Sequence, residues 1–280
     1  MSTRLTVTHS ESLVPGTRRI WFRSDDLSAF ADSRYTDRYV KVVFPPAGQV
    51  LDQYDGLDLR RLRGTLEADK LPIVRTYTAL YPDVRAGTVA IDFVLHGDEG
   101  VAGPWAARAV PGDELLVNGP GGAYAPDPEA DWHLMVADEA ALPAVLAALD
   151  ELTSDAVVRV VLVAEDPAHQ PDLPGALRRG GPAELHVSSA HRAAGDTLVA
   201  ALRRVDWPPG RVQAFVHGEA EEVMRGVRPY LMHERGLDRD QLSISGYWRR
   251  GKSEEGFREW KRTNAEQDGQ VAKRRRPTGD

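Results

Sequence analysis

Four consecutive residues, Arg75, Thr76, Tyr77 and Thr78, bring a fixed cation, a flat phenol and two hydroxyls to the end of an expected strand. The planar guanidinium of arginine forms paired, charge-assisted hydrogen bonds with phosphate oxygens, and a tyrosine ring offers a flat face to a planar ligand. Alternation along a strand places Arg75 and Tyr77 on one face and the two threonines on the other, so a twist or bulge would have to bring Thr78 round. The stretch suits a mount for a flat, phosphorylated cofactor; the alternative is an ordinary strand end rich in β-formers.

A second group of candidate residues lies in the stretch 92–122, where an expected strand ends at His96. A glycine-rich loop follows, and PWAARA predicts a short helix that begins near Pro104, because proline suits the first turn of a helix. Backbone N–H groups at a helix start can receive a phosphate, and His96 and Trp105 offer flat rings. The alternatives are a capped helix, a core tryptophan and a polar turn histidine.

Two kinds of element must position these residues. Alternating stretches at 18–24, 38–46, 87–97 and 113–122 with turn signals between them predict a closed antiparallel barrel. The stretch 124–131, YAPDPEAD, is typical of a linker because of its prolines and carboxylates. Beyond it, expected strands alternate with expected helices, which predicts a parallel sheet with helical faces. The strands are expected at 132–138, 156–166, 183–189, 212–218 and 242–248, and the helices at 139–152, 196–205 and 219–236.

The expected fold class is therefore β followed by α/β: an N-terminal antiparallel β-barrel over residues 1–126 and a parallel-sheet α/β nucleotide-binding domain over residues 127–262. Residues 263–280 have almost no apolar content, and we expect them to be disordered. The basic run KRRRP in this tail could touch nucleic acid or anionic lipid, and the alternative is a solvated tail.

Composition narrows the classes of protein. The chain has 280 residues, a net charge of −7 and no cysteine. The charge disfavours nucleic acid as a partner, no apolar run approaches the length of a bilayer span, and the N-terminus lacks the apolar segment of a secretory signal. Disulfides, thiolate metal sites and a cysteine nucleophile are excluded. We expect a cytoplasmic monomer that binds neither nucleic acid nor membrane, has no metal ligands of its own, and owes any redox chemistry to a bound cofactor.

Taken in order, several stretches resemble the siderophore-interacting protein family, which is related to the ferredoxin-reductase-like flavoproteins. They are YVKVVFPP, RTYT, IDFVLHGDEG, PWAARAVPGDELLVNGPGG, ADEAALPAVLAAL, HGEAEEVMRGVRPYL and SGYWRRGKSEE, and they span nearly the whole chain before the tail. The resemblance implies a protein that binds FAD on the barrel and reduces the iron of ferric siderophores with NAD(P)H, bound on the α/β domain, or with a ferredoxin.

The resemblance also implies roles for single residues. Arg75 would hold the FAD pyrophosphate, Tyr77 would stack on the isoalloxazine ring, and Thr78 would hydrogen-bond near its reactive edge. Tyr247 or Trp248 would cover the ring. The implied cofactor contacts are Arg75, Thr76, Tyr77, Thr78, Asp92, Phe93, Val94, His96, Ala102, Gly103, Trp105, Tyr247 and Trp248.

The α/β domain would hold the nicotinamide nucleotide where a parallel-sheet strand ends and a helix begins. The implied contacts are Asp138, Glu139, Ala140, Glu219 and Arg249, and the alternative for Asp138 and Glu139 is a helix-capping pair. Lys41, Arg249 and Lys252 would attract the anionic iron chelate, and the alternative for the cations near residue 250 is pairing with nearby glutamates.

Four positions depart from the family pattern. Gly103 and Pro104 stand where the family often has serine and arginine, Gly121 stands where it often has arginine, and Ala140 stands where it often has threonine. The lost arginine belongs to the basic rim that the family uses for anionic siderophores, so these departures put the choice of substrate in doubt.

Three functions fit these residues. The first is a reductase in which a hydride passes from NAD(P)H to FAD and single electrons pass from the flavin to Fe(III) in a bound siderophore, without any protein ligand to the iron. The second is a general flavin-dependent reductase that exchanges electrons with a ferredoxin or a quinone. The third is a protein that binds a ferric siderophore without turnover.

Overall fold

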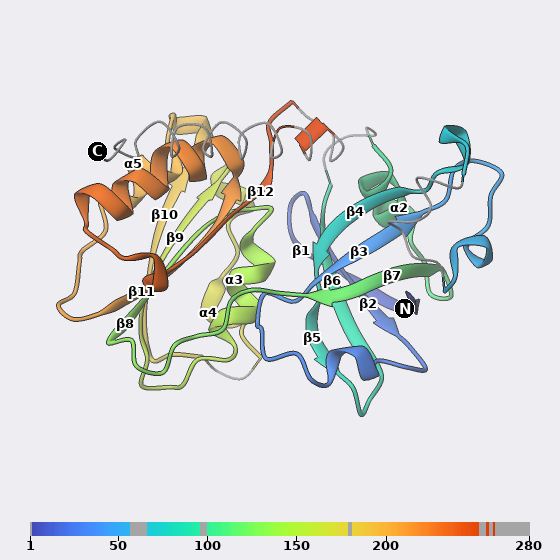
Figure 1. Cartoon of the computed structure of the whole chain (residues 1–280), viewed down its shortest axis with the longest axis horizontal. Helices are drawn as coiled ribbons and strands as arrows, with labels where there is room; N and C mark the ends of the chain where they lie inside the picture. The colour runs from blue at the N-terminus through green and yellow to red at the C-terminus, as the bar shows by residue number, and fades with distance from the viewer. Residues whose placement is uncertain are drawn as a thin grey trace, which may run out of the picture.

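The structure is a computed structural model that describes residues 2–56, 66–95, 100–178, 181–251, 256–257 and 260. It contains a curved antiparallel sheet and a parallel sheet that carries helices, which lie side by side in Figure 1. The predicted fold class, a barrel followed by an α/β domain, is confirmed. His96, Lys252 and the tail 263–280 lie outside the described residues, so the predictions made for them are not addressed by the structure.

The first sheet has its strands in the order β4-β3-β7-β1-β2-β6-β5, all antiparallel. Its two edge strands, β4 and β5, are consecutive in the chain and are joined by Ala79 alone. A single residue can connect opposite edges only if the sheet curls round on itself, so the sheet forms a barrel. The strands are β1 (Ser2–Val14), β2 (Thr17–Arg23), β3 (Tyr39–Phe44), β4 (Ile73–Thr78), β5 (Leu80–Asp83), β6 (Thr88–Val94) and β7 (Glu114–Gly121).

A short helix, α2 (Ala102–Arg108), packs on the barrel core through Ala102 and Ala106. It begins before Pro104, slightly earlier than expected, so the proline lies within the first turn, where its missing N–H costs no helical hydrogen bond. The Arg18 guanidinium donates to the carbonyls of Ala106, Ala107 and Ala109 and thereby satisfies the last carbonyls of the helix. The 3-10 helices of this part are η1 (Ser28–Phe30), η2 (Leu51–Tyr54) and η3 (Ala68–Lys70).

The second sheet is parallel, in the order β10-β9-β8-β11-β12. Its central strands are nearly continuous runs of buried apolar residues, as expected when helices cover both faces. The strands are β8 (Trp132–Asp138), β9 (Val157–Ala164), β10 (Glu184–His191), β11 (Val212–Glu219) and β12 (Leu242–Trp248). The α-helices are α3 (Leu142–Leu149), α4 (Leu173–Ala176) and α5 (Leu198–Leu202). The 3-10 helices are η4 (Pro167–His169), η5 (Arg192–Ala194) and η8 (Arg239–Gln241), and the π-helices are η6 (Glu222–Val227) and η7 (Tyr230–Glu234).

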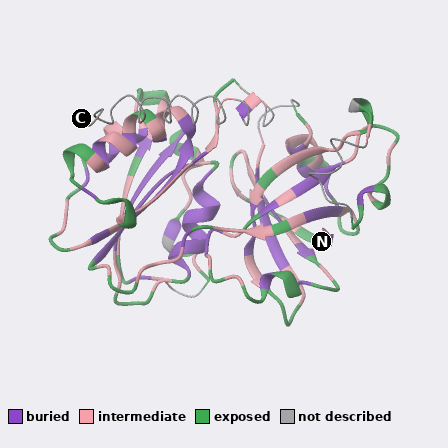
Figure 2. Cartoon of the chain, viewed as in Figure 1, coloured by how far each residue is buried: buried purple, intermediate pink, exposed green. Residues whose placement is uncertain are grey.

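Helix α3 lies between the two sheets (Figure 1) and is buried along its whole length, as the purple ribbon in Figure 2 shows. All eight residues of α3 are buried, so the helix has no solvent-exposed face. Its cluster includes Leu80 and Ala90 of the barrel as well as Met135 and Phe215 of the parallel sheet. An apolar helix that contacts both units joins them through a shared hydrophobic core.

The single helix expected at 219–236 is confirmed as one continuous helical stretch over residues 220–234, and most of this stretch is π-helical, in η6 and η7. One element of the barrel differs from expectation. Strand β1 was not expected, because polar residues alternate along it and only Leu5 and Val7 are buried. Residues 122–131 connect the sheets without a helix or strand, where the linker was expected. No helix in the described ranges is long and apolar enough to cross a bilayer.

Candidate active site at the domain junction

Strand β4 carries the residues from which the cofactor mount was inferred. Ile73 and Tyr77 pack against the barrel core, and Arg75 shares their face in a half-buried position. Thr76 is exposed and Thr78 is buried on the opposite face. The β3–β4 ladder is regular through the pair Tyr39 and Thr78, so the bulge that would turn Thr78 round is absent. A ligand that touched both Tyr77 and Thr78 would have to lie across the edge of the sheet, which β4 forms.

The aromatic residues of the predicted cofactor set gather at one end of the barrel. The ring centroids of Tyr77 and Phe93 are 4.6 Å apart, and those of Phe93 and Trp105 are 5.8 Å apart. Phe93 has no exposed surface, so it supports the other two rings rather than offering a face of its own. Val94 ends strand β6, and the carbonyl oxygen of Val94 lies 3.8 Å from where a Cβ on Gly103 would be.

Asp92 is placed differently from its neighbours. It points away from the barrel core and binds Arg19 through two hydrogen bonds of 2.6 and 2.8 Å, and the side chains of Asp92 and Arg19 are only 3% and 5% exposed. The two residues are direct partners in the β2–β6 ladder. The carboxylate is therefore held inside the protein, and its side chain is not positioned to meet a cofactor.

The last strand of the parallel sheet reaches the barrel at Tyr247. This ring packs on the cluster that contains Leu80, and its hydroxyl is buried without a hydrogen bond to any part of the chain that the structure describes. Burial raises the pKa of the Tyr247 phenol well above its usual range, nearby Asp37 raises it further, and the Thr78 side chain lowers it. Thr78 and Tyr247, predicted from stretches far apart in the sequence, thus lie together at the junction.

Asp138 forms the centre of a buried network at the carboxyl end of the parallel sheet. Its Oδ2 accepts hydrogen bonds of 2.8 Å from the Trp248 indole Nε1 and 2.8 Å from the backbone N–H of Glu219. Its Oδ1 accepts from the N–H of Ala141 at 3.2 Å, which is the capping role considered as the alternative. Burial raises the pKa of Asp138 to about 6, although the Trp248 donor and the nearby Arg192 guanidinium oppose this shift.

Glu219 continues the same network. Its Oε1 accepts from the Arg249 guanidinium at 2.7 Å and from the backbone N–H of Arg250 at 3.1 Å. Its Oε2 accepts from the N–H groups of Glu221 and Glu222 at 2.8 and 2.9 Å. Burial alone would raise the pKa of Glu219, but the Glu222 backbone donor and the Arg249 guanidinium together hold it below the usual value.

The structure thus brings together Asp138, Glu219, Trp248 and Arg249. These residues form hydrogen bonds with one another. Arg249 also pairs with Glu221, so the alternative of cations neutralised by nearby glutamates applies to this arginine. Their clearest effect is to fix the chain at residues 247–250 against strands β8 and β11.

Glu139 and Ala140 face a more open part of the same edge. Ala140 is exposed, and the Glu139 side chain is about one-fifth exposed. The Glu139 Oε1 accepts from the backbone N–H of Glu165 at 2.9 Å and lies 2.9 Å from the His169 Nδ1. A Cβ on Gly16, at the tip of the β1–β2 hairpin, would be 3.7 Å from the His169 ring, so the barrel hairpin reaches this edge of the sheet.

Lys41 lies on the outer face of the barrel beside Thr76. The two residues are direct partners in the β3–β4 ladder, and the Lys41 ammonium donates to the Thr76 hydroxyl. The ammonium also lies 5.3 Å from the centroid of the Tyr39 ring, which is 37% exposed. The substrate candidate Lys41 is therefore next to the mount, whereas Arg249 lies in the network of the other domain.

Some residues at the junction were missed in the sequence. His217 is 2% exposed, and its ring lies 4.3 Å from Tyr247 and 4.1 Å from Phe215. Its place at the end of a parallel strand, one of the positions where such sheets bind ligands, was the signal that could have found it. Tyr39 was missed because it occurs within an ordinary strand pattern.

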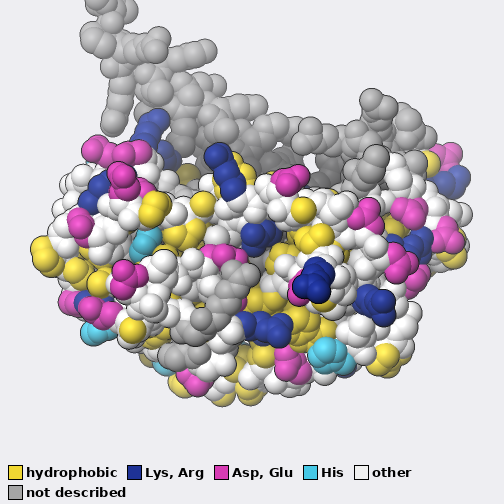
Figure 3. All heavy atoms as spheres, turned by 90° about the horizontal axis from the view of Figure 1, so that it is seen from below, with side chains coloured by type: hydrophobic (Ala, Val, Ile, Leu, Met, Phe, Trp, Pro, Cys, Tyr) yellow, Lys and Arg dark blue, Asp and Glu magenta, His cyan; other side chains and the backbone are white. Residues whose placement is uncertain are grey.

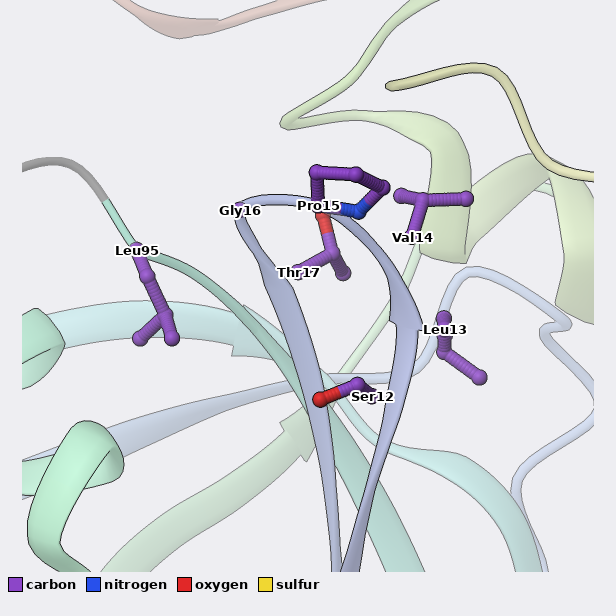
Figure 4. A pocket seen from close by; sticks show the side chains of 7 residues that line it. All are labelled: Ser12, Leu13, Val14, Pro15, Gly16, Thr17 and Leu95. Atoms are coloured by element: carbon purple, nitrogen blue, oxygen red, sulfur yellow. The ribbon is translucent and has the colours of Figure 1, made fainter. Parts of the chain in front are cut away.

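Two cavities in the described structure lie beside this junction rather than at the mount. One of about 430 Å³ is lined by the hairpin residues 12–17 and Leu95, and Figure 4 shows Pro15 at the hairpin tip and Leu95 across from it. The other, of about 500 Å³, lies between β5 and the end of α3, with Tyr81, Asp150 and Arg178 in its lining. Figure 3 shows the molecule from below, where hydrophobic and basic side chains gather near the middle of the face. Neither cavity is lined by residues 75–78.

Comparison with known proteins covers both units of the chain. Residues 6–124 match the siderophore-interacting FAD-binding domain, and residues 130–251 match the siderophore-interacting protein family. An uncharacterized protein of Mycobacterium tuberculosis is 42% identical over 278 residues, which cover 93% of this chain and 94% of the relative. The ferric vibriobactin reductase of Vibrio cholerae is 31% identical over 249 residues, which cover 86% of this chain and 87% of the relative.

A second reductase and a solved structure are also similar to this chain. The NADPH-dependent ferric-chelate reductase of Escherichia coli is 34% identical over 160 residues, 55% of this chain and 58% of the relative. The crystal structure of a siderophore utilization protein from T. fusca superposes with a TM-score of 0.70 at 32% identity and covers 90% of this chain and 94% of that chain.

Proposed function

The chain belongs to the siderophore-interacting protein family, and from this premise we propose that it is a flavin-dependent oxidoreductase that reduces Fe(III) in ferric siderophores to Fe(II). The proposal extends to this chain what the names of its reductase relatives say of those proteins. We further propose that the boundary between an FAD-binding and an NAD(P)H-binding domain lies near residue 126 and that the protein works in the cytoplasm.

The observation that carries the proposal is the meeting of Thr78 with Tyr247 at the domain junction. A reductase of this kind must hold its flavin where the barrel and the nucleotide-binding sheet both reach it. The end of β4 and the end of β12 converge there, because Tyr247 packs against the cluster that contains Leu80 and the Thr78 side chain is close enough to lower the pKa of Tyr247. The convergence supports a reaction centre between the two units rather than inside either one.

The residues at the junction fit FAD. The side chain of Tyr247 has a buried hydroxyl with no hydrogen-bond partner among the described residues, and such a group is costly unless something satisfies it. Arg75 would bind the pyrophosphate with its planar guanidinium, and Tyr77 would lie against the flat ring system. Thr78 and Tyr247 would supply hydroxyls near the edge of the ring.

The chemistry that FAD supplies when bound is acceptance of a hydride and delivery of single electrons to Fe(III). The protein's own residues would position the flavin and enclose it. Asp138 and Glu219 fix the segment 247–250, so that Tyr247 keeps its place against the barrel. Iron enters as substrate inside its chelate and needs no ligand from the protein.

For the electron donor we propose NADPH at the carboxyl edge of the parallel sheet. The name of the Escherichia coli relative supports this choice, and parallel sheets bind nucleotides at this edge. Glu139 and Ala140 border the open part of the edge, and Asp138, Glu219 and Arg249 would act by holding its shape. Lys41 would attract the anionic chelate from the barrel side.

The test is reconstitution followed by turnover. Purified protein incubated with FAD and desalted should retain flavin absorbance, and with NADPH and a ferric siderophore it should produce Fe(II), measured by a ferrous-specific chromogenic chelator. Two Fe(II) per NADPH are expected, because one hydride carries two electrons. Retained flavin that NADPH does not reduce would move the donor to ferredoxin, and failure to retain FAD at all would overturn the proposal.

A further inference from the structure

Tyr81, three residues after Thr78, has a backbone conformation that is unusual for its type. Its φ is +51°, and among the residues that the structure describes it is the only non-glycine residue with a positive φ. The ladder between β5 and β6 shifts register between Leu80 and Asp83, so Tyr81 lies in a bulge of the edge strand. A left-handed bulge position usually takes glycine, because a side chain is strained there. Such a conformation persists only where the surrounding contacts hold it.

Two arginines from different units contact the Tyr81 ring. The Arg19 guanidinium carbon lies 5.1 Å from the ring centroid, and the Arg178 guanidinium carbon lies 5.3 Å from it. Arg19 belongs to β2 of the barrel, whereas Arg178 follows α4 of the parallel-sheet unit. The Trp21 ring stacks on Tyr81 at 6.0 Å and lies 4.7 Å from the Arg178 guanidinium carbon. We call these four residues the tyrosine clamp.

Both arginines of the clamp are themselves anchored. Arg19 binds the buried carboxylate of Asp92 through two hydrogen bonds, which fix the position of its guanidinium. The backbone N–H of Arg178 donates to the Asp150 Oδ1 at 2.8 Å, and Asp150 is the residue that follows α3, the helix that contacts both units. A cation over an aromatic face is attracted by the ring. The clamp therefore ties the bulge in the barrel to the end of α3.

The clamp lies at one end of a short segment whose other end is the proposed reaction centre. Thr78 ends β4, Ala79 connects it to β5, and Leu80 packs in the cluster that also contacts Tyr247. Only two residues separate Thr78 from Tyr81, so a change in the backbone at Tyr81 also moves the positions before it. A cavity of about 500 Å³ is lined by Tyr81, so the ring has room to move if its contacts are lost.

We propose that Arg178 is a positioning residue for the flavin site. It reaches across from the parallel-sheet unit and, through Tyr81, fixes the segment 78–81 on which Tyr247 packs. The inference rests on the proposed function, since it takes the junction of Thr78 and Tyr247 as the place where the flavin binds. Arg178 itself contacts neither of these two residues, so its effect on the site depends on Tyr81.

The first measurement is hydrogen exchange of the full chain without FAD, read by mass spectrometry on peptides that cover residues 78–83. Arg178→Ala should speed exchange there by about fivefold, the scale of one lost cation–aromatic contact. Arg203→Ala is the matched control and should leave exchange at 78–83 unchanged. Its guanidinium carbon lies 4.6 Å from the Tyr230 ring centroid, within the parallel-sheet unit alone.

The second measurement is the affinity for FAD, together with the visible circular dichroism of the bound flavin, and neither needs a nicotinamide or an iron chelate. Arg178→Ala should weaken FAD binding by about threefold and change the dichroism, and Arg178→Lys, which returns a cation to the rings, should recover most of the affinity. Glycine accepts the left-handed φ without strain. In a Tyr81→Gly background, Arg178→Ala should therefore change FAD affinity by less than about twofold.

Unchanged exchange at 78–83 in Arg178→Ala, unchanged FAD binding in the same variant, or an equal loss of FAD affinity with and without Tyr81→Gly would each overturn the inference. If these effects appear but the protein reduces no ferric chelate, the proposed function fails and the clamp stands. If the protein reduces ferric chelates and Arg178→Ala changes neither exchange nor FAD binding, the proposed function stands and the clamp fails.

Discussion

The barrel side of the junction and the carboxyl edge of the parallel sheet both carry residues that the sequence marked as functional, but they use them differently. On the barrel side, Tyr39 and Thr76 are exposed and Arg75 and Tyr77 are half-buried, so their side chains are within reach of a ligand. At the sheet edge, Asp138 and Glu219 are each 2% exposed, and their oxygens accept hydrogen bonds from the protein itself.

The difference shows that residue type and position in the sequence do not distinguish a residue that binds a ligand from one that holds the fold in place. A carboxylate after a parallel strand can bind a nucleotide, but it can equally hold another strand in place. Burial and hydrogen-bond partners distinguish the two roles. We therefore propose that the barrel-side residues contact ligands directly and that the buried carboxylates Asp138 and Glu219 hold the chain in position.

The largest effect is expected from Asp138→Ala. The substitution leaves the Trp248 indole N–H and the Glu219 backbone N–H buried without their acceptor, and we expect the free energy of unfolding to fall by about 3–5 kcal/mol. Urea denaturation followed by tryptophan fluorescence measures this change. Glu139→Ala, at the open part of the same edge, is the matched control and should cost less than about 0.5 kcal/mol. Unchanged stability with lost NADPH binding would make Asp138 a nucleotide ligand instead.

The second-largest effect is expected in the pH dependence of the unfolding free energy, and it also arises from the buried Asp138. The pKa of Asp138 is about 6 in the fold and 3.8 ordinarily, so the folded protein holds this proton more tightly than the unfolded chain. The stabilisation from the proton is complete below the ordinary pKa and is lost as pH rises through 6, a change of about 3 kcal/mol. The difference in unfolding free energy between the unsubstituted protein and Asp138→Asn, measured without FAD from pH 4 to 7, should show this slope. A difference that stays constant with pH would contradict the assignment.

Arg75→Ala tests whether Arg75, on the barrel side of the junction, contacts FAD. Loss of its charge-assisted hydrogen bonds to the pyrophosphate should weaken FAD binding by about 2 kcal/mol, roughly thirtyfold, while the unfolding free energy of the protein without FAD changes little. Flavin fluorescence quenching gives the affinity. Arg23→Ala, an exposed arginine at the end of β2, is the control and should bind FAD normally. Equal affinity in both variants would remove Arg75 from the site.

The smallest effect is expected from Tyr247→Phe, where the two regions meet. Removal of a buried hydroxyl that lacks a partner among the described residues should stabilise the protein without FAD by about 1 kcal/mol. The rise in melting temperature on adding FAD should then be smaller than in the unsubstituted protein. A loss of stability without FAD would mean that the hydroxyl is satisfied by a neighbour such as Thr78.

Much of the architecture could be predicted from local patterns. Alternating stretches such as 87–97 and apolar runs such as 132–138 correspond to β6 and β8, and the linker at 124–131 falls between the sheets. Strand β1 could not be recognised, because it pairs on both sides yet buries few of its residues. The complete burial of α3 depends on the barrel packing against it, which no local pattern encodes.

Some features of the candidate site could likewise be predicted from local patterns, and others could not. The shared face of Arg75 and Tyr77 followed from alternation in a strand. The bond between Asp138 and Trp248 joins residues 110 positions apart and depends on strand order, so the sequence suggested two separate ligand contacts where the fold has one buried network. The fit of Tyr39 over Gly121 depends on the register between β3 and β7, which sequence patterns do not determine.

The central claim, that the junction of Thr78 and Tyr247 is the reaction centre of a flavin-dependent ferric reductase, is tested most directly by an anaerobic titration. The FAD-reconstituted protein is titrated with NADPH and then with a ferric tris-catecholate while the flavin absorbance is recorded. The account predicts that one equivalent of NADPH bleaches the flavin and that two equivalents of Fe(III) restore it as Fe(II) appears. A flavin that bleaches with NADPH but is not reoxidised by any ferric chelate would contradict the claim.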